Sequence, residues 1–195
     1  MLFRQNALQT LDEYFKQMGQ RQDQCVYFYR INTYNEAIKN FVRRYYEVAR
    51  KNGVIIEGKI PNPDEKNLSY DAEIMGIDFQ MSPGFMESGL KKWLPRMNDV
   101  QRKNVTMSLY DTLDGMRKAG KTENMLKNAY IKFMCWLYYK FERIVNQLGQ
   151  DDVPKILYEG DISSYELKLF CILSGAGCDL SLIHISEPTR PEPIS

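Results

Sequence analysis

Residues 155–179 read KILYEGDISSYELKLFCILSGAGCD, and this stretch decides the fold class. Its first five residues form a short, largely apolar run between a proline and a glycine, which is typical of a buried strand. Ser163 and Glu166 have the spacing of a capping box, which predicts a helix that ends at the glycine-rich residues 175–177. A further strand is expected to begin at Asp179. Strand, loop, helix, turn and strand together form the first βαβ unit of a doubly wound α/β domain.

Helical periodicity dominates the chain before this unit. Apolar residues at spacings of three and four predict four helices, over residues 8–18, 34–52, 98–119 and 122–148. Thr33 and Glu36 form a capping box that would begin the second of them. Two aromatic or β-branched runs predict strands, at residues 25–31 and 54–57. Residues 58–95 mix glycine and proline with apolar residues, and they predict a long loop with a helical turn or two.

The sequence therefore predicts an α-rich α/β protein, in which a helical N-terminal region with short strands precedes the start of a truncated Rossmann-like domain. We expect a mainly helical domain with two short strands over residues 1–150. Residues 151–179 are expected to supply the first strand and helix of the α/β domain. The boundary falls where the hydrophobic period changes from that of a helix to that of a strand.

Residues 180–195 break the pattern of the preceding chain. Residues 180–190 read LSLIHISEPTR, which resembles the translation of a transposase adapter used to prepare sequencing libraries. We therefore expect an adapter-derived, non-native tail, with the second strand and the rest of the α/β domain missing; a genuine proline-rich surface tail is the alternative. His184, the only histidine, lies in this tail. Without it, no Ser-His-Asp or Cys-His arrangement can be built.

Composition and charge exclude several classes of protein. The chain has 195 residues, of which 44% are hydrophobic and 26% are charged, so it can bury a sizeable core. Its net charge of +1 gives no specific signal for nucleic acid or an anionic membrane. We find no apolar run that would span a bilayer and no signal peptide, so we expect a cytoplasmic protein. The four cysteines lack CxxC spacing and are expected to be reduced core thiols.

The sharpest candidate site is the loop that contains Glu159, Gly160, Asp161 and Ser163. This loop follows a strand and precedes a helix, where open α/β sheets bind ligands and where free amides attract anions. Ser163 would offer its hydroxyl and backbone amides to a phosphate, and Glu159 or Asp161 would accept from a ribose hydroxyl or hold a metal. The alternative is a capped helix with solvated acids, because two carboxylates repel an anion.

Arg30 is the second candidate. Beside Tyr27 and Tyr29, its guanidinium could stack on a base or bind a carboxylate or phosphate through two nitrogens. The alternative is an ordinary strand with one aromatic face toward the core and one polar face toward water. An aromatic stripe that includes Trp136 and Tyr139 predicts either core packing or a docking groove.

Acidic residues in and around the long loop could act as acid/base carboxylates or cation ligands: Asp71, Glu73, Asp78 and Glu87. Nothing in the sequence fixes their geometry. The sequence accordingly assigns no catalytic residue, no metal site and no cofactor. The candidate ligand-binding residues remain Arg30 and the four named in the loop after residue 158.

Two stretches resemble a bacterial protein family. Residues 154–162 (PKILYEGDI), with Tyr165 and Glu166 and the later GCD at residues 177–179, are similar to the opening of the α/β domain in the YceG-like family. That family is described as a component of a biosynthetic module. Residues 28–31 (FYRI) look similar to another of its motifs. The resemblance implies a longer soluble protein from tellurium-resistance and stress-response operons, with partners encoded in the same operon, and it implies no particular reaction.

Two functions follow from these observations. The first is the N-terminal part of a component of a biosynthetic module linked to tellurite or stress response. Such a protein would bind an anionic small molecule, such as a nucleotide or a sugar nucleotide, around Gly160 and Ser163. The second is a non-catalytic helical module that binds another protein through the face of Trp136 and Tyr139. Whether the protein is an enzyme stays open, because catalysis needs convergent groups that these patterns do not reveal.

Overall fold

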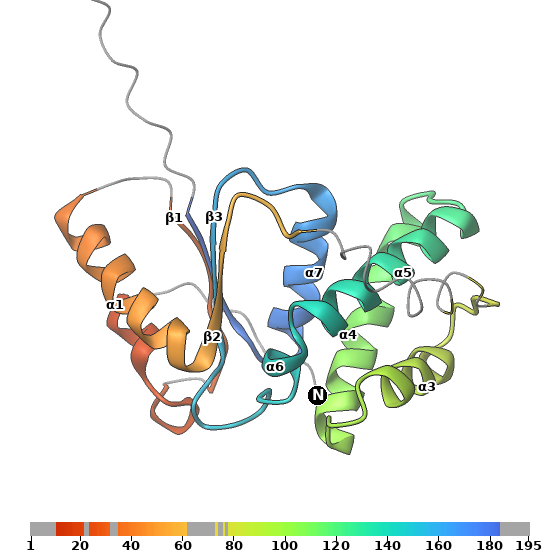
Figure 1. Cartoon of the computed structure of the whole chain (residues 1–195), viewed down its shortest axis with the longest axis horizontal. Helices are drawn as coiled ribbons and strands as arrows, with labels where there is room; N and C mark the ends of the chain where they lie inside the picture. Colours follow the sequence, from red (N-terminus) through yellow and green to blue (C-terminus); the bar gives the residue numbers. More distant parts are fainter. Residues whose placement is uncertain are drawn as a thin grey trace, which may run out of the picture.

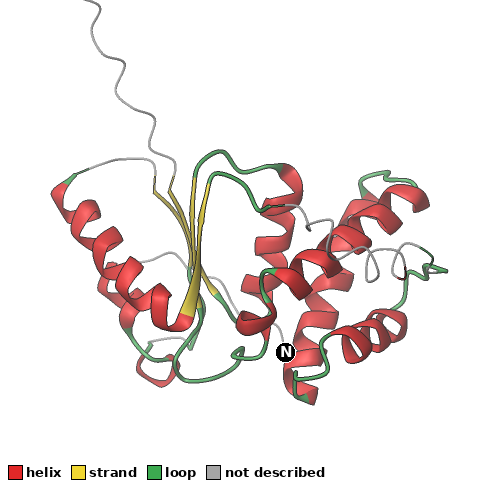
Figure 2. Cartoon of the chain, viewed as in Figure 1, coloured by secondary structure: helices red, strands yellow, loops and turns green. Residues whose placement is uncertain are grey.

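The fold is seen in a computed structural model of the chain, which describes residues 11–21, 24–31, 35–61, 73, 76 and 78–183. A sheet of four parallel strands stands between layers of helices, as Figures 1 and 2 show. Helix α1 (Glu36–Asn52) covers one face of the sheet. Helix α7 (Ser164–Gly175) covers the other face and packs on α4 (Asp99–Lys118). The predicted mixed α/β class is thereby confirmed.

The strand order of the sheet is β1-β4-β3-β2, and every neighbouring pair is parallel. The strands are β1 (Phe28–Ile31), β2 (Gly53–Glu57), β3 (Lys155–Glu159) and β4 (Asp179–Ile183). The central strands β3 and β4 are buried almost throughout, as parallel strands covered by helices on both faces usually are. The three strands predicted before residue 160 are confirmed, although the first is shorter than predicted.

Strand β4 completes the βαβ unit. The expectation that this unit lacks its second strand is wrong, because residues 179–183 pair with β1 on one side and with β3 on the other. All five residues are buried. The adapter origin of residues 180–195 stays a prediction, since a Leu-Ser-Leu-Ile stretch forms a buried strand whatever DNA encodes it.

The predicted domain boundary at residue 150 lies between helix α6 (Glu142–Val145) and β3. Strands from both sides of this boundary share one sheet, because β2 pairs with β3 and β1 pairs with β4. Residues 151–183 thus supply the two central strands, and the chain before them supplies both edges. The boundary is therefore not a division between two sheets.

Aromatic side chains fill the space between α1 and the sheet. Tyr14, Phe41 and Tyr45 are buried there, with neighbouring ring centroids 5.5 Å apart. Tyr14 comes from a 3-10 turn, η1 (Leu11–Phe15), whereas the other two lie on one face of α1. The spacing of four residues places both α1 rings on the same side of the helix.

The start of the chain differs from its predicted helix over residues 8–18. Its described part forms two 3-10 turns, η1 and η2 (Met18–Gln20), because Gln17 between them has extended backbone angles. Helix α1 begins after Asn35, whose side chain accepts a hydrogen bond from the N–H of Ile38 at 2.9 Å. The predicted capping residue Thr33 lies outside the described residues.

Helix α3 (Pro83–Trp93) lies within a stretch predicted to be mostly loop, and that prediction is wrong here. Ser82 caps the helix by accepting from the N–H of Phe85 at 3.3 Å, and Pro83 takes the first helical position, where it is well tolerated. Gly89 is tolerated for a packing reason. A Cβ at Gly89 would overlap the hydroxyl of Tyr130, so glycine lets α3 and α5 (Glu123–Tyr139) approach closely.

The single helix predicted over residues 122–148 is two helices. Helix α5 begins after Thr122, whose hydroxyl accepts from the N–H of Met125, and it ends at Tyr139. Helix α6 follows after Phe141, which is fully buried. The apolar period continues across the break, which explains why the pattern alone predicts one helix.

A buried polar cluster fastens the N-terminal segment to the amino edge of the sheet. Arg21 donates two hydrogen bonds to the carboxylate of Asp179, at 2.8 and 2.6 Å, and the Nζ of Lys155 lies 3.4 Å from the same carboxylate. The backbone N–H of Tyr27 donates to it as well, at 2.9 Å. No residue of the ionic triplet is more than 3% exposed. The cluster is thus part of the core.

Two further predictions concern the burial of the cysteines and the presence of a membrane-spanning helix. Cys25, Cys135 and Cys178 are buried free thiols, as predicted, but Cys171 is exposed on α7, so the prediction of a core position is wrong for that residue. Within the described ranges, no helix combines the length and the apolar character that a bilayer span needs.

Candidate ligand-binding site

A hollow of about 270 Å³ lies at the carboxyl edge of the sheet, on the face that α7 covers. Its lining comes from β1, β3, β4 and the loop after β3: Arg30, Tyr158, Gly160, Asp161, Ile162 and Leu182. We call it the carboxyl-edge pocket. The two candidate regions predicted far apart in the sequence, at Arg30 and at Gly160 with Asp161, therefore line one cavity.

Strand register explains this convergence. Arg30 pairs with Leu182, and Leu182 pairs with Tyr158, so the three form one row across β1, β4 and β3. Side chains in one row point to the same face of a sheet. Tyr158 packs edge-on against Phe170 of α7 with ring centroids 5.4 Å apart, which identifies that face as the α7 side. Because β1 is an edge strand, Arg30 is exposed, and within the described residues it forms no ion pair.

Gly58, Gly160 and Tyr158 fix the conformation of the loop after β3, which lines the pocket. Gly160 has φ = 130°, and a Cβ there would lie 3.2 Å from the Cα of Gly58 in the loop after β2, so both the angle and the contact require glycine. The hydroxyl of Tyr158 lies against the carbonyl oxygens of Gly58 and Asp161, at 2.9 Å from the latter. Burial, followed by the charges of Glu166 and Asp161, raises the pKa of Tyr158 to about 12. The hydroxyl therefore stays protonated and donates to these carbonyls.

Ser163 caps helix α7 and is not among the residues that line the pocket. Its hydroxyl accepts from the N–H of Glu166 at 3.3 Å, and the Glu166 carboxylate accepts from the N–H of Ser163 at 2.8 Å. The same carboxylate accepts from the N–H of Ile60 at 2.7 Å. Burial raises the pKa of Glu166, but the hydrogen bonds from Ser163 and Ile60 outweigh it and hold the pKa below its usual value. An internal carboxylate thus occupies the helix N-terminus that was predicted to receive a phosphate.

Glu159 points to the opposite face of the sheet. Its carboxylate and that of its cross-strand neighbour Glu57 both accept from the hydroxyl of Tyr46 on α1, at 3.3 and 3.1 Å. Alternation along β3 explains the difference, because consecutive residues of a strand face opposite sides. Glu159 is therefore next to the pocket in sequence but outside it in space.

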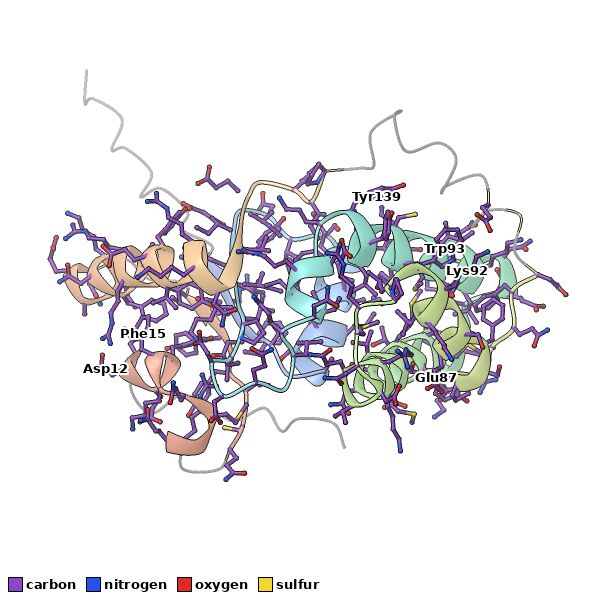
Figure 3. All side chains as sticks on the ribbon, turned by 60° about the horizontal axis from the view of Figure 1, so that its bottom comes forward. Asp12, Phe15, Glu87, Lys92, Trp93 and Tyr139 are labelled. Carbon is purple, nitrogen blue, oxygen red and sulfur yellow. The ribbon has the colours of Figure 1, made fainter. Side chains whose placement is uncertain are left out.

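The aromatic candidates are mostly core residues. Trp136 is 3% exposed, so the predicted docking groove through this side chain is wrong and the alternative of core packing is confirmed. Tyr139, which Figure 3 labels, lies at the end of α5 and is half-buried. Its ring packs edge-on against that of Tyr138. Tyr27 and Tyr29 pack on the α1 side of the sheet, whereas Phe28, on the same face as Arg30, packs against the larger core cluster. The role of Arg30 stays a prediction.

The described acidic candidates of the long loop, Glu73, Asp78 and Glu87, form no cluster of three potential metal ligands. Asp71 lies outside the described residues, and Glu73 forms an ion pair with Lys92 of α3. Figure 3 shows Lys92 and Glu87 on this helix, at the opposite end of the molecule from Asp12. Over the part of the chain that the structure describes, no three potential metal ligands come together.

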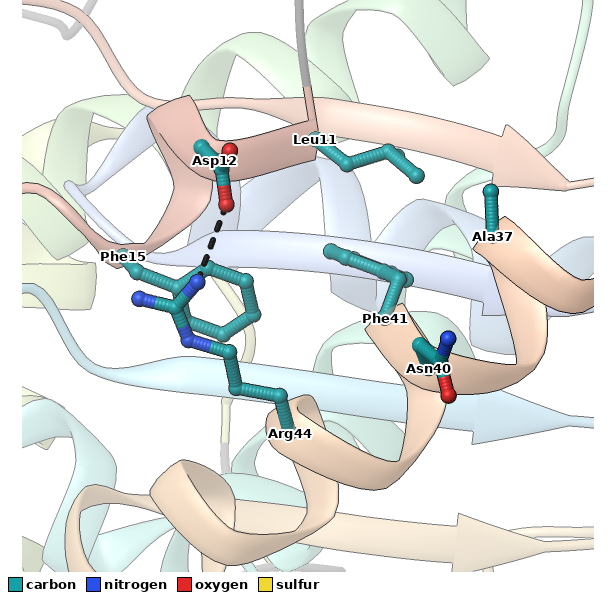
Figure 4. Close-up of a pocket in the computed structure, with 7 residues that line it drawn as sticks. All are labelled: Leu11, Asp12, Phe15, Ala37, Asn40, Phe41 and Arg44. Carbon is teal, nitrogen blue, oxygen red and sulfur yellow. Dashed lines mark hydrogen bonds and ion pairs between the residues drawn. The ribbon is translucent and has the colours of Figure 1, made fainter.

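A second hollow, of about 260 Å³, lies between η1 and α1 (Figure 4). The charged groups that line it already bind each other, because Arg44 donates to Asp12 at 2.9 Å. The guanidinium of Arg44 also stacks on the ring of Phe15 at 3.9 Å from its centroid. In this hollow the lining guanidinium, that of Arg44, is paired with a carboxylate, whereas in the carboxyl-edge pocket Arg30 forms no ion pair within the described residues.

Sequence reasoning missed three residues of the carboxyl-edge pocket: Tyr158, Ile162 and Leu182. Tyr158 directly precedes the predicted loop residues and Ile162 lies between two of them, and alternation along the strand places Tyr158 on the face opposite Glu159. Leu182 belongs to the segment predicted to be adapter-derived. The polar groups of the pocket, by contrast, all precede residue 180.

One of three comparisons with known proteins finds a match, to a protein-family model. Residues 6–190 match the family model of the YceG domain. No curated protein and no solved structure matches the chain. The matched range contains every helix and strand described above, including both edges and the centre of the sheet. The chain therefore belongs to the YceG domain family.

Proposed function

We propose that this domain binds a small phosphorylated ligand that carries hydroxyl groups, such as a nucleotide or a sugar nucleotide, in the carboxyl-edge pocket. One observation carries the proposal. Arg30 of β1 and the loop at Gly160 and Asp161 line a single cavity at the carboxyl ends of parallel strands.

The position of the pocket in the sheet supports a ligand site. The chain leaves β1 toward α1 on one face and leaves β3 toward α7 on the other (Figure 1). Open α/β sheets bind ligands in the crevice where such connections diverge, outside the carboxyl ends of the strands. On this ground we also group the domain with the Rossmann-like folds.

The charges of the pocket favour a ligand with both an anionic and a hydroxyl-bearing part. The guanidinium of Arg30 presents a planar fork that suits two oxygens of a phosphate. The carboxylate of Asp161 is an acceptor for sugar hydroxyls. At about 270 Å³ the cavity is slightly below the range of roughly 300–1,000 Å³ typical of sites for drug-sized ligands, so it would receive one end of the ligand.

Thermal unfolding with and without ligand tests the proposal. AMP, ADP and UDP-glucose are added separately to the full chain. A ligand present at one hundred times its Kd adds about 2.7 kcal/mol, which raises the Tm of a chain of this size by roughly 5–10 °C. Arg30→Ala should abolish the rise. Arg43→Ala is the control, because Arg43 is exposed on α1 outside the pocket and the charge change is the same.

Asp161→Asn separates the two parts of the ligand. It should weaken the response to the sugar nucleotide more than the response to AMP. The proposal fails if none of the three ligands stabilises the protein, or if Arg43→Ala removes the response as fully as Arg30→Ala does.

We further propose that this binding serves a component of a biosynthetic module in the bacterial tellurite or stress response, located in the cytoplasm. Its support is the resemblance of residues 154–162 and 28–31 to that family. Deletion of the gene in its host should sensitise growth to tellurite, and the wild-type gene should restore resistance. Equal restoration by the Arg30→Ala gene would argue against a role for the pocket in that response.

A further inference from the structure

A third hollow, of about 370 Å³, lies at the amino end of β2, at the opposite end of the strands from the carboxyl-edge pocket. Its lining combines apolar and basic residues: Ala49, Arg50, Gly53, Val54, Ile55, Lys140 and Arg143. We call it the basic pocket. Three of these seven residues are cationic and none is acidic. The basic pocket is distinct from the carboxyl-edge pocket, since the two share no residue and lie at opposite ends of the strands.

The three cations come from three different elements. Arg50 lies in the last turn of α1, Lys140 follows the last residue of α5, and Arg143 lies in α6. Arg143 is fixed by the fold, because its guanidinium donates to the carbonyls of Gly53 and Lys51. This arginine therefore forms a wall of the pocket whether or not a ligand is present.

Arg50 and Lys140 differ from Arg143 in the interactions of their side chains. Within the described part of the chain neither forms an ion pair or a hydrogen bond through its side chain. Cations at the C-terminal ends of helices are stabilising, and that effect explains each of them separately. It does not explain why both converge with Arg143 on one hollow, since like charges that share a cavity repel.

We infer that the basic pocket binds a diphosphate group, either as inorganic pyrophosphate or as part of an organic molecule. A diphosphate supplies several negative charges, which suits three cations that no carboxylate of the lining neutralises. Guanidinium groups bind phosphate oxygens in pairs, and an ammonium group adds a compact point charge. This site goes beyond the proposed function, because it uses none of the residues of the carboxyl-edge pocket.

Calorimetric titration of the full chain with sodium pyrophosphate tests the inference, with sodium chloride at equal ionic strength as the blank. The double variant Arg50→Gln with Lys140→Gln should raise the Kd at least about tenfold, because it removes two charge-assisted hydrogen bonds to the diphosphate. Arg143 is left intact because the fold uses it. The matched control is Arg43→Gln with Lys121→Gln, which removes two exposed cations outside the pocket and should leave the Kd unchanged.

Amide chemical shifts locate the site. Pyrophosphate should shift the amide signals of residues 49–55 and 140–143 and leave those of residues 158–163 in place. Titration of the Arg30→Ala protein with ADP and with pyrophosphate identifies the source of the diphosphate, since that variant disables the carboxyl-edge pocket. If ADP binds more tightly than pyrophosphate, the site takes an organic diphosphate. If pyrophosphate binds more tightly, the site takes the inorganic ion.

Three results would overturn the inference. The first is no heat and no shift beyond the chloride blank. The second is an equal loss of affinity in the control double variant, which would indicate a diffuse surface charge effect. The third is a pocket double variant with unchanged pyrophosphate affinity and a lower Tm, which would reduce Arg50 and Lys140 to stabilisers of their helix ends.

Discussion

Replacing Arg21 by methionine should lower the free energy of unfolding by about 3 kcal/mol. The side chains of Arg21 and Asp179 are both 0% exposed, and Arg21 also donates to the carbonyls of Lys16 and Cys25, at 3.1 and 2.9 Å. Methionine supplies no donor, so Asp179 keeps only the ammonium of Lys155 at 3.4 Å and one backbone N–H. Removing one partner of a buried ion pair typically costs about 3–5 kcal/mol, and the remaining lysine favours the lower end of that range.

Urea unfolding followed by the fluorescence of Trp93 and Trp136 measures this loss, and a thermal scan should show a fall in Tm of roughly 6–12 °C. Arg43→Met is the control, because an exposed arginine should change stability by less than about 0.5 kcal/mol. Arg21→Met combined with Asp179→Asn should lose less than the sum of the two single variants. A loss below about 1 kcal/mol in Arg21→Met, or strict additivity in the double variant, refutes the reasoning.

Three further predictions follow from particular contacts. Gly89→Ala should destabilise the protein by about 1–3 kcal/mol through overlap with the hydroxyl of Tyr130, and Tyr130→Phe in the same chain should restore most of the loss; no restoration would show that the clash lies elsewhere. Gly160→Ala should cost about 1–3 kcal/mol because of its positive φ, whereas Gly115→Ala in the open interior of α4 should gain roughly 0.5–1 kcal/mol, both measured by urea unfolding. If both glycine substitutions change the free energy of unfolding in the same direction, this reasoning is wrong. The folded-state pKa of Glu166 is depressed, so its contribution to stability is present above the unfolded pKa and is lost as pH falls through the folded pKa. Wild type should therefore lose more stability than Glu166→Gln between neutral pH and acid; parallel curves would contradict this.

The parts of the fold that were predicted correctly depend on local signals. The run at residues 155–159 and the capping box at Ser163 and Glu166 specify strand and helix within a few residues, and both form as predicted. The local pattern does not predict helix α3, because proline and glycine within a helix usually break it. Pro83 is in fact at the first helical position, where proline is tolerated. Gly89 is required by its contact with the hydroxyl of Tyr130, which lies far along the chain and which no local pattern connects to Gly89.

The candidate site was predicted only in part, for a similar reason. The sequence predicts both Arg30 and the loop at Gly160 as candidates, but their convergence depends on β1 pairing with β4, and no local periodicity encodes that pairing. Position along the chain groups Glu159 with its neighbours, although alternation along the strand turns its side chain to the other face of the sheet. The sequence predicts that Ser163 binds a phosphate, yet Glu166 of its own helix supplies the carboxylate that accepts from the N–H of Ser163.

The strand order has a consequence for how this polypeptide acquires its shape during synthesis. Strand β1 emerges early from the ribosome, but its only neighbour in the described sheet, β4, is translated some 150 residues later. Until then β1 has nothing to pair with, and the nascent chain displays its aromatic residues to chaperones and to other unfinished chains. Sheets with such distant pairings close slowly and are exposed to aggregation while they wait. A pause in translation before residue 179 therefore leaves the described sheet without the strand that joins β1 to β3.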